Sequence, residues 1–128
     1  MMANRFDEIR SDESRALQVY LILIGAARNR QILTYNVLAE MLRFKGAGVF
    51  AGILGHVMFW CKDENLPALT SLVVNQDTGL PGDGLITPEN ANREREKVYQ
   101  FDWYSVVPPT TQQLDASFVK GMTAIGKR

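Results

Sequence analysis

The spacing of apolar residues predicts two helices in the first third of the chain. From Ala16 to Ala27 the apolar positions recur at helical spacing and form a broad stripe, in a helix that Ser11 or Asp12 can cap. A second, short helix is predicted after Thr34, which is another good N-cap residue, and it should end near Arg43.

The third predicted helix is the most apolar part of the chain and runs from about Val49 to Lys62. Its glycines, Gly52 and Gly55, each cost about 1 kcal/mol relative to alanine inside a helix. We therefore expect them to allow the close approach of another backbone.

The stretch LPALTSLVVNQDTGLPGDG, residues 66–84, changes abruptly from apolar to turn-forming residues. The segment from Leu69 to Val74 favours a strand, and the Asn, Asp, Gly and Pro residues that follow it favour a loop or a hairpin. Beyond the loop, Thr87 before Pro88 predicts the start of a charged helix. Trp103 and its neighbours then suggest an extended apolar piece.

A final helix is predicted from Thr111 to Met122. The element order predicts an α+β fold with a helix-turn-helix or winged-helix-like core, a short strand or hairpin and added C-terminal helices. We expect a single domain over residues 1–128, in which residues 11–84 form the core and residues 85–128 a helical and aromatic extension.

Composition supports one soluble domain. With 128 residues and 46% hydrophobic content the chain is long enough to bury one core. Its longest apolar-rich stretch falls short of the ~20 residues that span a bilayer, and its charged N-terminus is unlike a signal peptide. A single cysteine forms no internal disulfide, which is typical of a reducing compartment. We expect a cytoplasmic protein with no membrane partner.

The formal net charge is zero, but the charges are unevenly distributed. Residues 28–62 hold five basic residues and one acid, whereas residues 63–102 hold eight acids and three basic residues. Such polarity is compatible with a basic face that meets phosphate, although ordinary solvated surfaces show it too.

At Thr34-Tyr35 and Leu38-Ala39 the sequence resembles the DNA-binding domain of alkylguanine-DNA alkyltransferases and alkyltransferase-like proteins, whose motif is T-Y-G-x-[LI]-A. The resemblance covers roughly residues 17–84 and extends through the glycine-containing third helix to Val73-Val74 and Gly79. It implies a winged-helix-like fold and a DNA-facing surface.

The chain lacks the residues with which this family carries out alkyl transfer and nucleotide flipping. Alkyltransferases carry P-C-H-R, with the nucleophilic cysteine, directly before the V-V strand, and this chain has LTSL there. The family's arginine, which fills the gap left by a flipped nucleotide, would fall near Gly52 and is absent, and Asn36 replaces the family's glycine. Tyr35, which in the family presses on a phosphate during nucleotide rotation, is retained. The resemblance therefore implies binding without alkyl transfer and no enzymatic activity.

The leading hypothesis is a non-enzymatic module that binds double-stranded DNA. In this hypothesis the start of the second helix contacts the DNA backbone, basic residues neutralise phosphate, and small residues let the third helix approach a groove. The expected site comprises Arg28, Arg30, Thr34, Tyr35, Asn36, Arg43, Lys45, Gly48, Ala51 and Gly52. The third helix is poor in the side chains that read base edges, so we expect no sequence-specific readout.

Two alternatives belong to other functional classes. The first is a protein-interaction or homodimeric assembly module, because the third helix carries more apolar surface than one short helix normally buries; its apolar residues are Val49, Phe50, Ile53, Met58, Phe59 and Trp60. The second is a small-molecule pocket between the third helix and Trp103 or Tyr104, with His56 near its mouth.

We expect no metal ion and no cofactor. One cysteine, Cys61, and one histidine, His56, give too few soft ligands for a structural zinc site. The loop at residues 75–84 lacks the closing glutamate of a calcium loop and the lysine of a phosphate-binding loop. Cys61 should be a small buried hydrophobe, and His56 a helix-surface or core-edge residue with one satisfied ring nitrogen.

Overall fold

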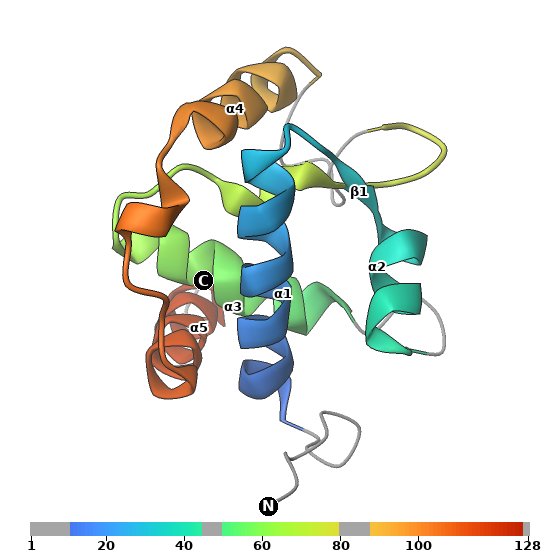
Figure 1. Ribbon diagram of the computed structural model, residues 1–128. Helices are drawn as coiled ribbons and strands as arrows, with labels where there is room; N and C mark the ends of the chain where they lie inside the picture. Colours follow the sequence, from blue (N-terminus) through green and yellow to red (C-terminus); the bar gives the residue numbers. More distant parts are fainter. Residues whose placement is uncertain (1–10, 45–49, 80–87, 127–128) are drawn as a thin grey trace, which may run out of the picture.

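The computed structural model describes residues 11–44, 50–79 and 88–126 (Figure 1). These residues form five α-helices and a two-stranded parallel sheet, which fits a helical member of the α+β class. The helices are α1 (Asp12–Arg28), α2 (Tyr35–Leu42), α3 (Phe50–Asp63), α4 (Pro88–Gln100) and α5 (Thr111–Gly126). None of the helices in this part of the chain is long and apolar enough to cross a membrane.

The two predicted N-terminal helices are confirmed, and their caps explain where they begin. Ser11 is the N-cap of α1, and its hydroxyl accepts a hydrogen bond from the backbone N–H of Ser14. The hydroxyl of Thr34 accepts in the same way from the N–H of Val37 at 3.1 Å and starts α2. Arg43 ends α2 in a left-handed conformation, with φ of 60°.

The strand predicted from Leu69 to Val74 is confirmed only at its end, and the part of the predicted loop or hairpin beyond Gly79 lies outside the described residues. Leu69–Leu72 forms a 3₁₀ turn, and only β2 (Val73–Val74) is extended. Its partner is β1 (Leu33–Thr34), which it meets in a parallel register rather than in a hairpin. The physical reason is burial, because a turn with three residues per repeat puts Leu69 and Leu72 on one side, whereas a strand would put them on opposite faces.

The C-terminal prediction is confirmed for α4 and α5 and corrected between them. Trp103–Ser105 is a 3₁₀ turn rather than an extended piece. Thr110 and Gln113 form a reciprocal cap, in which each side chain accepts from the other residue's N–H, and α5 continues beyond Met122 to Gly126. The expected cap at Thr87 lies outside the described residues.

Helix α3 lies at the centre of the fold, where α1 packs on one side of it and α5 on another (Figure 1). Its glycines face side chains and not a backbone, which corrects the prediction. A Cβ added at Gly55 would lie 3.0 Å from Cε1 of Phe118 in α5, and one added at Gly52 would lie 3.2 Å from a carboxylate oxygen of Asp12. Conversely, Gly121 of α5 receives the ring of Phe59 from α3.

We expect Gly121→Ala to destabilise the protein. The new methyl group would overlap the Phe59 ring, and such overpacking typically costs ~1–3 kcal/mol, which exceeds the ~1 kcal/mol gained in helix propensity. Urea unfolding should show a lower midpoint. Gly126→Ala is the matched control, because nothing lies within 4 Å of its added Cβ. Equal stability of the two variants would contradict the described packing of α5 on α3.

Candidate functional site

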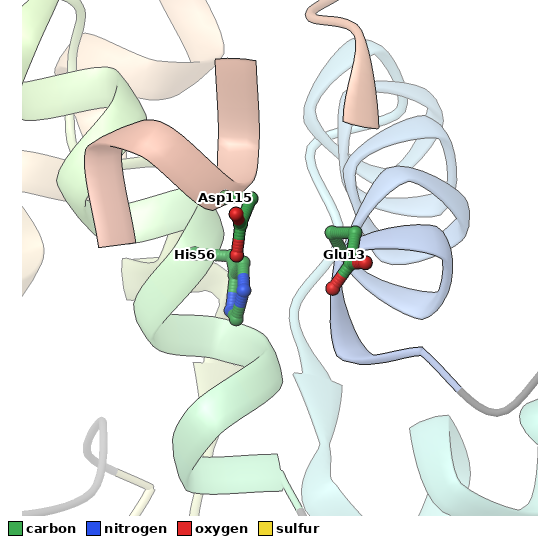
Figure 2. A group of neighbouring side chains, drawn as sticks. All are labelled: Glu13, His56 and Asp115. Atoms are coloured by element: carbon green, nitrogen blue, oxygen red, sulfur yellow. The ribbon is translucent and has the colours of Figure 1, made fainter. Parts of the chain in front are cut away.

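Three side chains that are far apart in the sequence meet where α1, α3 and α5 pack together. They are Glu13 in the first turn of α1, His56 in the middle of α3 and Asp115 in the second turn of α5 (Figure 2). One potential ligand atom of each residue lies within 4.8 Å of the others. We call these three residues the junction cluster.

The imidazole of His56 is buried and held in one orientation. The residue is only 2% exposed, and its ring stacks on Phe118 with centroids 4.0 Å apart and planes inclined by 4°. Nδ1 lies 2.7 Å from the carbonyl oxygen of Gly52, and a carbonyl only accepts, so Nδ1 carries the proton. The nitrogen that the sequence interpretation expected to be satisfied is therefore Nδ1.

The two carboxylates of the junction cluster have no counter-charge in the described part of the chain. Neither Glu13 nor Asp115 makes a hydrogen bond or an ion pair with another described residue. Asp115 is exposed and Glu13 half-buried, so solvent can reach the cluster. The sequence interpretation considered only Cys and His as ligands, and therefore missed both acids. Their separation in sequence gives no spacing signal, since only the packing of three helices joins them.

The start of α2 and the loop after β2 lie side by side. The side-chain amide of Asn36 donates to the side-chain oxygen of Gln76 at 3.0 Å. The guanidinium of Arg95 donates to the carbonyls of Ser71 at 3.2 Å and Gly79 at 2.8 Å, which fixes the other side of this loop. Thr34 uses its hydroxyl for the cap. Asn36 is thus exposed at the start of α2, whereas Tyr35 is half-buried and packs against the core.

The basic residues expected to neutralise phosphate are spread over the fold. Arg28 and Arg30 lie at the C-terminal end of α1, whereas Arg43 lies at the far end of α2. Arg30 makes a double hydrogen bond with Glu96 of α4, at 3.2 Å for both contacts, and this lowers the pKa of the Glu96 carboxyl. Lys45 and Gly48 fall outside the described residues.

The small residues of α3 do not form an open surface. Ala51 is exposed in the first turn, but Gly52 faces Asp12 of α1. Nine residues of α3 are buried, among them Phe50, Ile53, Phe59 and Trp60. These four residues are therefore buried within the chain and do not supply the expected surplus of apolar surface for a dimer contact.

An aromatic hollow of about 430 Å³ opens between α1 and the segment that follows α4. Its lining includes Ile24 and Arg28 from α1 together with Tyr99, Phe101, Trp103 and Tyr104. The expected pocket thus involves Trp103 and Tyr104, but α1 and not α3 forms its other wall, and His56 is not part of it. Gln100 and Asp102 add polar groups.

Comparisons with known protein families, curated protein sequences and solved structures found no match to this chain.

Cys61 is buried, as the sequence predicted, and burial raises the pKa of its thiol from 9.0 to about 12. Burial likewise raises the pKa of the neighbouring Tyr20 from 10.0 to about 12. The thiol is therefore protonated and inert near neutral pH.

We expect stability to fall in alkaline solution. Cys61 and Tyr20 have higher pKa values folded than unfolded, so the contribution of each is complete below its unfolded pKa, about 9 and about 10, and is lost as pH rises toward 12. Each group can remove up to about 1.4 kcal/mol per pH unit in that window. Urea unfolding at several pH values should show the decline, and Cys61→Ala should flatten it. Rapid labelling of the native thiol at pH 8 would contradict its burial.

Proposed function

We propose that this chain is a non-enzymatic module that binds the backbone of double-stranded DNA through a winged-helix-like surface. The surface consists of the first turn of α2, with Tyr35 and Asn36, and the loop at residues 75–79. One observation supports the proposal. The Asn36–Gln76 hydrogen bond holds the loop at residues 75–79 next to the start of α2, and the helices and the loop follow one another along the chain in the order that the alkyltransferase-like resemblance implies.

The chemistry of this surface suits phosphate better than bases. The N-terminus of α2 presents backbone N–H groups and the positive end of the helix dipole, which attract an anion. Arg43 adds a cation with no described partner, but at the other end of α2, about 12 Å along the helix, whereas Glu40 and Asp77 reduce the attraction. We therefore expect weak, salt-sensitive binding that differs little between sequences.

The burial of α3 limits how DNA can be bound. A helix covered by α1 and α5 cannot enter a groove along its length, so base readout by α3 is not part of the proposal. The Leu69–Leu72 turn, which occupies the position of the alkyltransferase nucleophile, holds no cysteine and its Ser71 is buried. We therefore propose binding without alkyl transfer.

Titration of the chain with unrelated duplexes at low ionic strength tests the proposal. Arg43→Ala should weaken binding several-fold for all duplexes and reduce the salt dependence, because one phosphate contact is lost. Lys62→Ala is the matched control, since Lys62 is exposed and lies about 18 Å along α3 from the α2 side. Absence of wild-type binding at micromolar concentration would refute the proposal. A dimeric mass in that case would favour the assembly alternative.

The aromatic hollow supports a second candidate function, the binding of a small flat ligand. Its volume lies within the usual range for ligand pockets, ~300–1,000 Å³, and aromatic walls with a few polar groups are typical of such sites. Arg28 and Asp102 offer a hydrogen-bond donor and an acceptor. A purine nucleoside presents the matching flat ring and polar edge.

Tryptophan fluorescence provides a direct measurement, because Trp103 lines the hollow. Adenosine should quench the emission saturably, and Tyr104→Ala should weaken binding ~10-fold through the loss of one stacking face. Val107→Ala is the control, since Val107 is 84% exposed and does not line the hollow. A linear, non-saturating response at millimolar adenosine would argue against a nucleoside site.

A further inference from the structure

We propose that the junction cluster of Glu13, His56 and Asp115 is a binding site for one divalent transition-metal ion, with Zn²⁺ as the best probe. This site is separate from the DNA surface and from the aromatic hollow. It would join the beginnings of α1 and α5 to the middle of α3 (Figure 2).

The first argument is the state of the buried histidine. Metal-bound histidines usually donate their second ring N–H to a carbonyl or a carboxylate, which fixes the tautomer and orients the ring. The contact from Nδ1 to the Gly52 carbonyl is of this kind, and the stacked Phe118 ring holds the imidazole plane. Nε2 makes no described hydrogen bond although the residue is only 2% exposed, so this nitrogen is available to a ligand that enters from the solvent side of the cluster.

The second argument is charge. Two carboxylates lie near the imidazole, and Asp12, which lies beside Gly52, adds a third acid to the same region. The three ion pairs found among the described residues involve Glu96, Glu94 and Asp63, so none of them compensates the junction cluster. A divalent cation would neutralise this charge.

The third argument is spacing. The ligand atoms lie within 4.8 Å of one another, which is close enough to surround one ion, whose bonds to nitrogen and oxygen measure ~2.0–2.2 Å. No described hydrogen bond or ion pair holds either carboxylate in another position.

The ligand set selects the kind of ion. An imidazole nitrogen favours zinc and other first-row transition metals over Mg²⁺ and Ca²⁺, which prefer oxygen ligands alone. Three protein ligands fall short of a closed tetrahedral site, so water would complete the coordination from the exposed side at Asp115.

Calorimetric titration of the tag-free full chain with Zn²⁺ tests the site. We expect one ion per chain, a thermal midpoint that rises with Zn²⁺ concentration, and weaker binding of Mg²⁺. Glu13→Gln and Asp115→Asn should each weaken Zn²⁺ binding at least 10-fold. Glu40→Gln is the matched control, because it removes the same charge from an exposed position on α2.

These two variants should fold like the wild-type chain, because no described hydrogen bond or ion pair holds the carboxylate that each one replaces. Replacement of the buried His56 would disturb the core instead. Nitrogen NMR of the imidazole gives a second measurement, in which Zn²⁺ should shift Nε2 much more than Nδ1. The proposal is overturned if Zn²⁺ fails to bind at 100-fold molar excess, if Glu13→Gln and Asp115→Asn bind as well as Glu40→Gln, or if the His56 resonances do not move.

Discussion

The packing of α5 against α3 is the contact on which the rest of the structure depends. A glycine of each helix packs against an aromatic ring of the other: Gly55 against Phe118, and Gly121 against Phe59. These reciprocal contacts let the two helices approach closely enough to bury large rings on both sides. Because protein interiors are close-packed, a single methyl group at either glycine would force the helices apart.

This contact decides which surfaces can have a function. It covers α3, so the third predicted helix is part of the core, and the surface proposed for DNA is limited to α2 and the loop after β2. It also stacks Phe118 on His56 and brings Asp115 to the same junction. The surface proposed for DNA and the site proposed for a metal ion are therefore separate, and the packing of α5 on α3 determines where both lie.

In the folded chain, part of the unevenly distributed charge is paired across segments that are far apart in the sequence. The basic and acidic segments partly meet at the surface, where Arg30 pairs with Glu96 and both side chains are about half exposed, at 59% and 49%. Such an exposed pair contributes little stability, roughly 0–1 kcal/mol, but it removes one cation from the expected DNA surface. Glu13 and Asp115 of the junction cluster are among the described acids that have no ion pair, and the charge count along the chain did not single them out.

The sequence by itself determined the local structure. Ser11 and Thr34 predicted where α1 and α2 begin, and the apolar stripe predicted α3 to within a residue or two, because caps and periodicity act over a few residues. Burial of Cys61 followed in the same way. Only the tertiary structure decided that Leu69–Leu72 turns instead of extending, that the glycines of α3 face Phe118 and Asp12, and that Glu13, His56 and Asp115 meet. Those outcomes depend on contacts between residues 40 to 100 positions apart, and local patterns contain no information about which distant side chain fills a given space.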